Sequence, residues 1–189
     1  MRLFFKRETS NVCEDPFSLT INGYSKTVRL VFGALLGSIA VILQSAGVFT
    51  GVGFIFSMMS TGPLVLSSLL SLRIGVMTYF VTAFLLAVIQ PSELLIFLFT
   101  TGLLGVSLGF GLKYLRRSVL IVLFAAFCLT LGITLLLYGF KFPILGPSVE
   151  TQFNGFVIVG TFFFSFFYSW IWKEISLYGG KYLHKLFDR

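Results

Sequence analysis

The sequence carries little charge for its length. Asp, Glu, Lys and Arg together make up 11% of the 189 residues, whereas hydrophobic residues make up 57% and the mean hydropathy is +0.97. A soluble domain of this size needs far more charge to keep its surface hydrated. This composition therefore predicts a protein that lies in a lipid bilayer.

Residues that bind metals or carry out catalysis are also scarce. The only histidine is His184, and the two cysteines, Cys13 and Cys128, lie in a polar segment and within an apolar run. We therefore expect no disulfide, metal site or cofactor. The sequence has no Ser–His pair, paired aspartates or HExxH motif of the kind that intramembrane proteases use, so we expect that the protein is not an enzyme.

No ionisable residue lies clearly in the middle of an apolar run. Proton relays and ion-coupled pumps normally need such groups at membrane depth, so this absence disfavours a transporter with its own proton or sodium coupling. An ion channel is disfavoured as well, because there is no ring of charges and no filter-like repeat.

Long apolar runs are what the chain does have, and they predict an all-α fold. A helix crosses the hydrocarbon core with about 20 mostly apolar residues. Six runs of about that size predict a six-helix transmembrane domain over residues 28–172, after a polar leader (1–27) and before a basic amphipathic tail (173–189) that Gly179-Gly180 would interrupt. The predicted spans are residues 30–49, 54–72, 74–89, 94–112, 118–138 and 155–172.

The basic residues predict the orientation of these spans. Six crossings that start inside leave 13 of the 14 Lys and Arg residues on the cytoplasmic side, among them the cluster Lys113-Tyr114-Leu115-Arg116-Arg117, and only Lys141 outside. Basic residues collect on the cytoplasmic side of membranes, so we expect both termini to be cytoplasmic. The net charge of +7 is then explained by topology and by contact with membrane lipids, and nucleic acid is not an expected partner.

Aromatic and proline residues suggest two local features. Trp170 and Trp172 stand where an interfacial aromatic belt is expected. Pro63, with Gly62 before it, is expected to bend the second helix.

Small residues form a stripe in the first span. Gly33 and Gly37 are four residues apart, so they fall on one helical face and allow another backbone to come close. The partner is either another helix of the bundle or a separate protein. Gly105 and Gly109 make a second such stripe in the fourth span, where packing inside the bundle is expected.

Polar side chains gather at the ends of spans that would face the outside. They fit a pocket that holds a small molecule among aromatic residues, although polar residues at helix ends also simply meet water. Gln44 stands out, because a long amide so near an apolar run needs a hydrogen-bonding partner. The candidate substrate-binding residues are Gln44, Ser45, Gln90, Glu93, Tyr138, Gln152 and Asn154.

Taken together, six spans, a basic leader, the small face Gly33-Ala34-Leu35-Leu36-Gly37-Ser38 and a second-span proline followed by Leu72-Arg73-Ile74-Gly75 resemble a known family. They are similar to the substrate-binding S components of energy-coupling factor (ECF) vitamin transporters and their uncharacterised relatives. The resemblance is architectural, covers most of residues 28–172 and includes no vitamin-specific motif.

The resemblance implies a bacterial protein of the cell membrane that binds a vitamin-like nutrient from outside for uptake. It implies that Gly33 and Gly37 contact a transmembrane coupling subunit, and that cytoplasmic ATPases supply the energy. The alternative is a non-catalytic scaffold or assembly subunit of an envelope complex, which needs only helix faces and a basic cytoplasmic surface.

Overall fold

Helices make up all the regular structure that is described. The structure, a computed structural model, describes residues 26–48, 52–115, 117–142 and 155–187, and for residues 52 and 180–187 only the backbone. No strand occurs among them. In chain order the elements are α2 (Lys26–Ser45), the 3₁₀ turn η1 (Ala46–Val48), α3 (Val52–Met59), α4 (Thr61–Leu70), α5 (Leu72–Ile89), α6 (Pro91–Phe99), α7 (Thr101–Tyr114), α8 (Ser118–Thr134), the π-helical turn η2 (Leu135–Gly139) and α9 (Gly155–Phe187).

Within the described ranges, six stretches of helix are long and apolar enough to cross a membrane, which confirms the predicted all-α class and the predicted number of such helices. Each stretch overlaps one of the predicted runs. Their bounds are Lys26–Val48, Gly53–Leu70, Leu72–Ile89, Pro91–Tyr114, Ser118–Gly139 and Gly155–Gly179.

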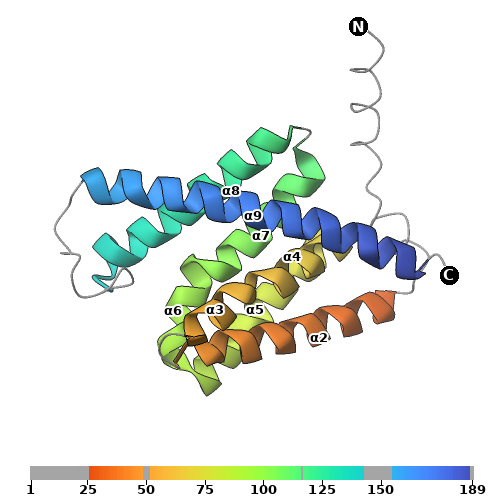
Figure 1. Ribbon diagram of the computed structural model, residues 1–189. Coiled ribbons are helices and arrows are strands. Elements are labelled where there is room, and N and C mark those ends of the chain that lie inside the picture. Colours follow the sequence, from red (N-terminus) through yellow and green to blue (C-terminus); the bar gives the residue numbers. More distant parts are fainter. Residues whose placement is uncertain (1–25, 49–51, 116, 143–154, 188–189) are drawn as a thin grey trace, which may run out of the picture.

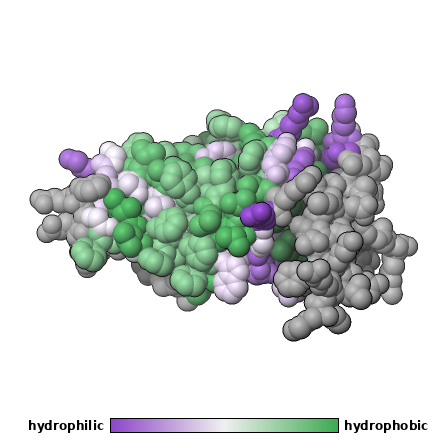
Figure 2. All heavy atoms as spheres, turned by 90° about the horizontal axis from the view of Figure 1, so that it is seen from above, coloured by the Kyte–Doolittle hydropathy of each residue, from purple (hydrophilic) through white to green (hydrophobic). Residues whose placement is uncertain are grey.

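The outside of the bundle is strongly apolar. Phe156 is 90% exposed, Phe84 and Val88 are each 71% exposed, and Ile42 is 70% exposed, which would be unfavourable in water. Figure 2 shows hydrophobic side chains across the middle of one face, with hydrophilic ones toward its ends. These features fit a multi-pass membrane protein.

The spans run back and forth between two ends of the bundle (Figure 1). We call one the Arg73 end, where α2 begins, α4 is followed by α5, and α7 is followed by α8. The other is the Gln90 end, where α2 finishes, α5 is followed by α6, and η2 finishes. Helices α4 and α7 pack against each other at the centre, α2 and α5 lie on one side of them, and α8 and α9 on the other.

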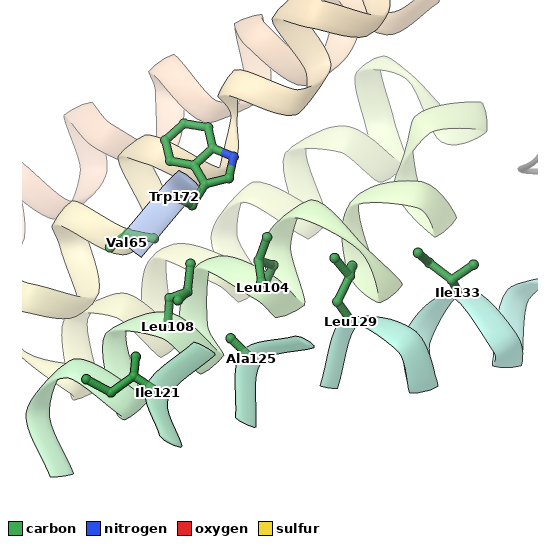
Figure 3. Packing of buried hydrophobic residues seen from close by; sticks show 8 residues of the cluster. All are labelled: Val65, Leu104, Leu108, Ile121, Ala125, Leu129, Ile133 and Trp172. Carbon is green, nitrogen blue, oxygen red and sulfur yellow. The ribbon is translucent and has the colours of Figure 1, made fainter. Parts of the chain in front are cut away.

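Close packing between α4 and α7 depends on the second glycine stripe. A Cβ atom on Gly105 would lie 2.6 Å from Leu64 Cβ, and one on Gly109 would overlap Ser68 Cβ. The expected packing of this stripe inside the bundle is therefore confirmed. Beside it lies an apolar cluster to which α4, α7, α8 and α9 contribute (Figure 3). Its buried members are Val65, Leu104, Leu108, Ile121, Ala125, Leu129, Ile133 and Trp172.

Two spans change part-way. The second passes from α3 to α4 at Ser60, which keeps helical dihedral angles (φ −60°, ψ −21°) and donates its N–H to the carbonyl of Ser57 (3.1 Å), so the helix tightens there without breaking. The fourth is broken at Thr100, between α6 and α7 (φ −122°, ψ −89°). Pro63 falls in the first turn of α4, where a helix has no donor to lose, so the change comes just before the proline that was expected to bend this span.

The last helix corrects two expectations. It continues from Gly155 to Phe187 without the predicted interruption at Gly179-Gly180, because a glycine costs only about 1 kcal/mol in a helix and the surrounding sequence outweighs this. Trp172 does not face outward, as a residue of an interfacial belt would, but is buried in the apolar cluster, where Gly62 makes room for its ring: a Cβ there would lie 3.1 Å from Trp172 Cζ3. Trp170 is 49% exposed.

Candidate functional site

Gln44 lies at the centre of a buried hydrogen-bond network near the Gln90 end. Its side chain is fully buried. Nε2 donates to Ser57 Oγ (2.7 Å) and to Glu93 Oε2 (2.9 Å), while Oε1 accepts from Ser60 Oγ (2.7 Å) and Thr101 Oγ1 (2.9 Å). An amide has two N–H groups and two lone pairs, so every hydrogen-bonding position of Gln44 is used within the protein. We call these five residues the Gln44 cluster.

The cluster joins segments that are far apart in the sequence. Gln44 comes from the last turn of α2, Ser57 from α3, and Glu93 from the first turn of α6. Ser60 lies between α3 and α4, and Thr101 follows directly on the break at Thr100. Both residues place a hydroxyl group on the same carbonyl oxygen of Gln44.

Glu93 is the acidic member of the cluster, and its side chain is enclosed. The residue is 7% exposed. Pro91 starts α6, which puts Glu93 in the first turn, where the helix dipole favours a negative charge. Among the described residues the only ion pair joins Lys173 to Glu174 (2.6 Å), so no described cation neutralises Glu93.

Gly47 lets the backbone of η1 come close to this carboxylate. A Cβ atom at position 47 would lie 2.8 Å from Glu93 Oε2 and 3.0 Å from Oε1. Any larger residue would push the carboxylate away from Gln44. Glycine at position 47, in the turn after α2, therefore leaves room for the Glu93 carboxylate to reach Gln44.

Gly47→Ala is expected to lower the free energy of unfolding by about 1–2 kcal/mol, because the new methyl group overpacks against Glu93. Unfolding in mixed micelles would measure this loss. The same substitution made together with Glu93→Ala is expected to cost less, since the atoms it would meet are gone. Equal losses in both backgrounds would show that the contact with Glu93 does not matter.

Five of the seven predicted site residues are described, and the structure brings two of these, Gln44 and Glu93, together. Ser45 is half-buried and its hydroxyl has no hydrogen-bond partner among the described residues, whereas Gln90 donates to the neighbouring Ser92 (3.0 Å). Tyr138 is half-buried in η2. Gln152 and Asn154 lie outside the described residues.

Sequence reasoning missed Ser57, Ser60 and Thr101. Short hydroxyl residues are common in membrane helices, and nothing in their local sequence shows that they meet Gln44. The nearest available indication was the position of Ser60 three residues before Pro63, where a helix has to restart.

The predicted partner surface of the first span is covered inside the chain. A Cβ on Gly33 would lie 2.6 Å from Ile74 Cγ2, and one on Gly37 would lie 3.3 Å from Thr78 Cγ2. Thr78 Oγ1 also donates to the carbonyl of Gly33 (3.2 Å). The structure thus assigns both glycines to the contact between α2 and α5, and does not leave them free to meet a coupling subunit.

The chemistry of the site is that of hydrogen bonding and one carboxylate. The described residues contain no group of three or more His, Cys, Asp or Glu side chains that could hold a metal ion. Cys128 is half-buried and is not in a disulfide. The cluster can therefore recognise hydrogen-bonding groups or positive charge.

Comparison of the chain with protein-family models, with curated proteins and with solved structures gave no match.

Proposed function

We propose that this protein is a substrate-binding membrane subunit of the S-component type, which takes up a small polar nutrient from outside the cell. The observation that carries the proposal is the Gln44 cluster: five polar side chains, one of them a carboxylate, are joined by hydrogen bonds at one place inside the bundle. Polar groups are costly in an apolar interior. A function in recognition explains why they are there.

The broken fourth span supports a binding role. Binding sites of membrane transporters are typically built where helices are discontinuous, because the break frees polar groups to face a ligand. In this chain the break at Thr100 lies next to Thr101, a member of the cluster. A ligand with donor and acceptor groups would exchange hydrogen bonds with the hydroxyls of the cluster.

The distribution of charge supports an orientation in which the Gln90 end faces outside. Of the basic residues whose side chains are described, only Lys141 lies at that end. The others, Lys26, Arg29, Arg73, Lys113, Arg117 and Lys173, are at or near the Arg73 end, which we place in the cytoplasm of a bacterial cell. The nutrient would then reach the cluster from outside, and anionic lipid headgroups would meet the cations.

We further propose that energy comes from partners, a transmembrane coupling subunit and cytoplasmic ATPases. The resemblance to S components implies such partners. Since α5 covers Gly33 and Gly37, a coupling subunit would have to contact another face of the bundle.

A second candidate is a non-catalytic scaffold subunit of an envelope complex. The observation that favours it is the saturation of Gln44, whose four hydrogen-bonding positions are all taken by the protein itself. On this reading the cluster fixes α2, α3, α6 and α7 relative to one another, and no ligand is involved.

A thermal-shift assay with a panel of vitamins and related nutrients separates the two candidates. A ligand at about 100 times its Kd adds about 2.7 kcal/mol to stability, so the binder is expected to show a saturable rise in Tm with at least one compound. A flat response across the panel, with no coupling subunit recovered with the protein, would favour the scaffold.

A further inference from the structure

Glu93 is the one acidic residue among those described that is buried without a cation beside it. Its carboxylate is 7% exposed and accepts a hydrogen bond from the neutral amide of Gln44. Glu174, the other described acid, pairs with Lys173. A buried carboxylate is strongly unfavourable unless a positive charge or several donors compensate it.

The groups around Glu93 are oxygen atoms suited to a hard cation. Ser57 Oγ and Glu93 Oε2 lie 2.7 and 2.9 Å from the same atom, Gln44 Nε2, so both oxygens are on the same side of the amide group. The hydroxyls of Ser60 and Thr101 lie on the other side of the amide group, where both donate to Gln44 Oε1. Alkali cations prefer carboxylate, hydroxyl and carbonyl oxygens, as calcium and magnesium do.

Rotation of the Gln44 amide would bring a third oxygen to these two. A half turn exchanges Nε2 and Oε1, so that Oε1 joins Ser57 Oγ and Glu93 Oε2. Ser60 and Thr101 can accept the amide N–H groups in place of donating to Oε1, and Ser57 can donate to Oε1, because hydroxyls do both. Only the hydrogen bond to Glu93 is lost, because carbonyl and carboxylate oxygens both accept, and a bound cation would take its place.

We propose that the Gln44 cluster binds a monovalent alkali cation such as sodium, with Glu93 as its charged ligand. One carboxylate balances one positive charge, whereas calcium sites usually combine several acidic residues. The break at Thr100, beside Thr101, matches this assignment, since discontinuous helices supply cation sites in membrane transporters. The cation would tie together α2, α3 and α6.

This site changes what the sequence alone indicated about ions. Glu93 lies near the end of its span in the sequence, so it did not count as a group at membrane depth. The fold encloses its side chain between η1, α2 and α6. Cation binding of this kind does not depend on the proposed nutrient and can be tested without one.

The experiment measures the Tm of the purified full-length protein in detergent as sodium chloride replaces choline chloride at constant ionic strength. We expect a saturable rise in Tm with sodium, and Ser57→Ala is expected to raise the half-saturating sodium concentration about tenfold. Ser92→Ala, which removes an exposed hydroxyl next to the cluster, is expected to leave the curve unchanged.

Glu93→Gln keeps the shape of the side chain and is expected to abolish the difference between sodium and choline. Identical curves for the wild-type protein in sodium, potassium and choline chloride would overturn the proposal, as would a Glu93→Gln protein that keeps the full sodium response. If Glu93→Gln does not fold, the proposal is tested by the half-saturating sodium concentrations of the two serine variants. Equal values for Ser57→Ala and Ser92→Ala would then overturn it. A positive nutrient assay without any cation effect would remove this site and leave the proposed function standing.

Discussion

Gln44→Ala is expected to lower the free energy of unfolding by about 3–5 kcal/mol. Hydrogen bonds between membrane helices average about 0.6 kcal/mol each, which gives about 1.8 kcal/mol for the three hydroxyl contacts. The bond to the carboxylate of Glu93 adds about 1.5–3 kcal/mol, because a buried charged group loses its donor. The substitution therefore acts on the whole Gln90 end of the bundle.

Reversible unfolding in mixed micelles measures this effect, and Gln90→Ala is the matched control. Gln90 is also an amide near the same end, but it bonds only to the nearby, exposed Ser92, so its loss is expected to cost less than about 0.5 kcal/mol. A Gln44→Ala protein as stable as the Gln90→Ala protein would show that the cluster does not hold the helices together.

Gly132→Ala is the second substitution with a large expected effect, a loss of about 3 kcal/mol or more. A Cβ atom at position 132 would overlap the carbonyl oxygen of Phe99, the last residue of α6. Overpacking usually costs about 1–3 kcal/mol when side chains can adjust. Here the obstacle is backbone next to the break at Thr100, which cannot move without shifting α6 and with it Glu93.

Gly160→Ala provides the control for this prediction. It is also a glycine in a membrane-spanning helix, but no atom lies within 4 Å of its Cβ position. Alanine is the better helix former by up to about 1 kcal/mol, so this variant is expected to be as stable as the wild type or slightly more stable. Equal losses for the two variants would mean that α8 does not pack on Phe99 as described.

Hydropathy was enough to predict the six spans, for a physical reason. In the hydrocarbon core every backbone group must be bonded within its own segment, so an apolar run of span length becomes a helix almost wherever it occurs. For this reason, the observed spans that end at Leu70 and Ile89 stop within two residues of their predicted ends, residues 72 and 89.

Changes inside spans were not predictable in the same way. The apolar composition continues through Ser60 and Thr100, so hydropathy does not change where the helix does. Likewise, the spacing of Gly33 and Gly37 predicts a close contact but does not say with which helix, because the choice of α5 is made by the tertiary fold.

The candidate site was predictable only in part. Gln44 could be singled out because an amide near the apolar core needs partners, and the structure supplies four. That Glu93 is one of them could not be read from the sequence, since 49 residues separate the two. Ser57, Ser60 and Thr101 become significant only when their helices are assembled.

The most direct test of the proposed function compares small molecules that co-purify with the wild-type protein and with two threonine variants. Thr101→Val and Thr130→Val both remove a buried hydroxyl with little change of shape, but Thr101 donates to Gln44 whereas Thr130 donates to the carbonyl of Ala126 in its own helix. Mass spectrometry of the purified samples is expected to detect a polar small molecule in the wild type and in Thr130→Val, and at least about tenfold less of it in Thr101→Val. Equal amounts in all three proteins, or no bound molecule in any of them, would contradict a binding site at the Gln44 cluster.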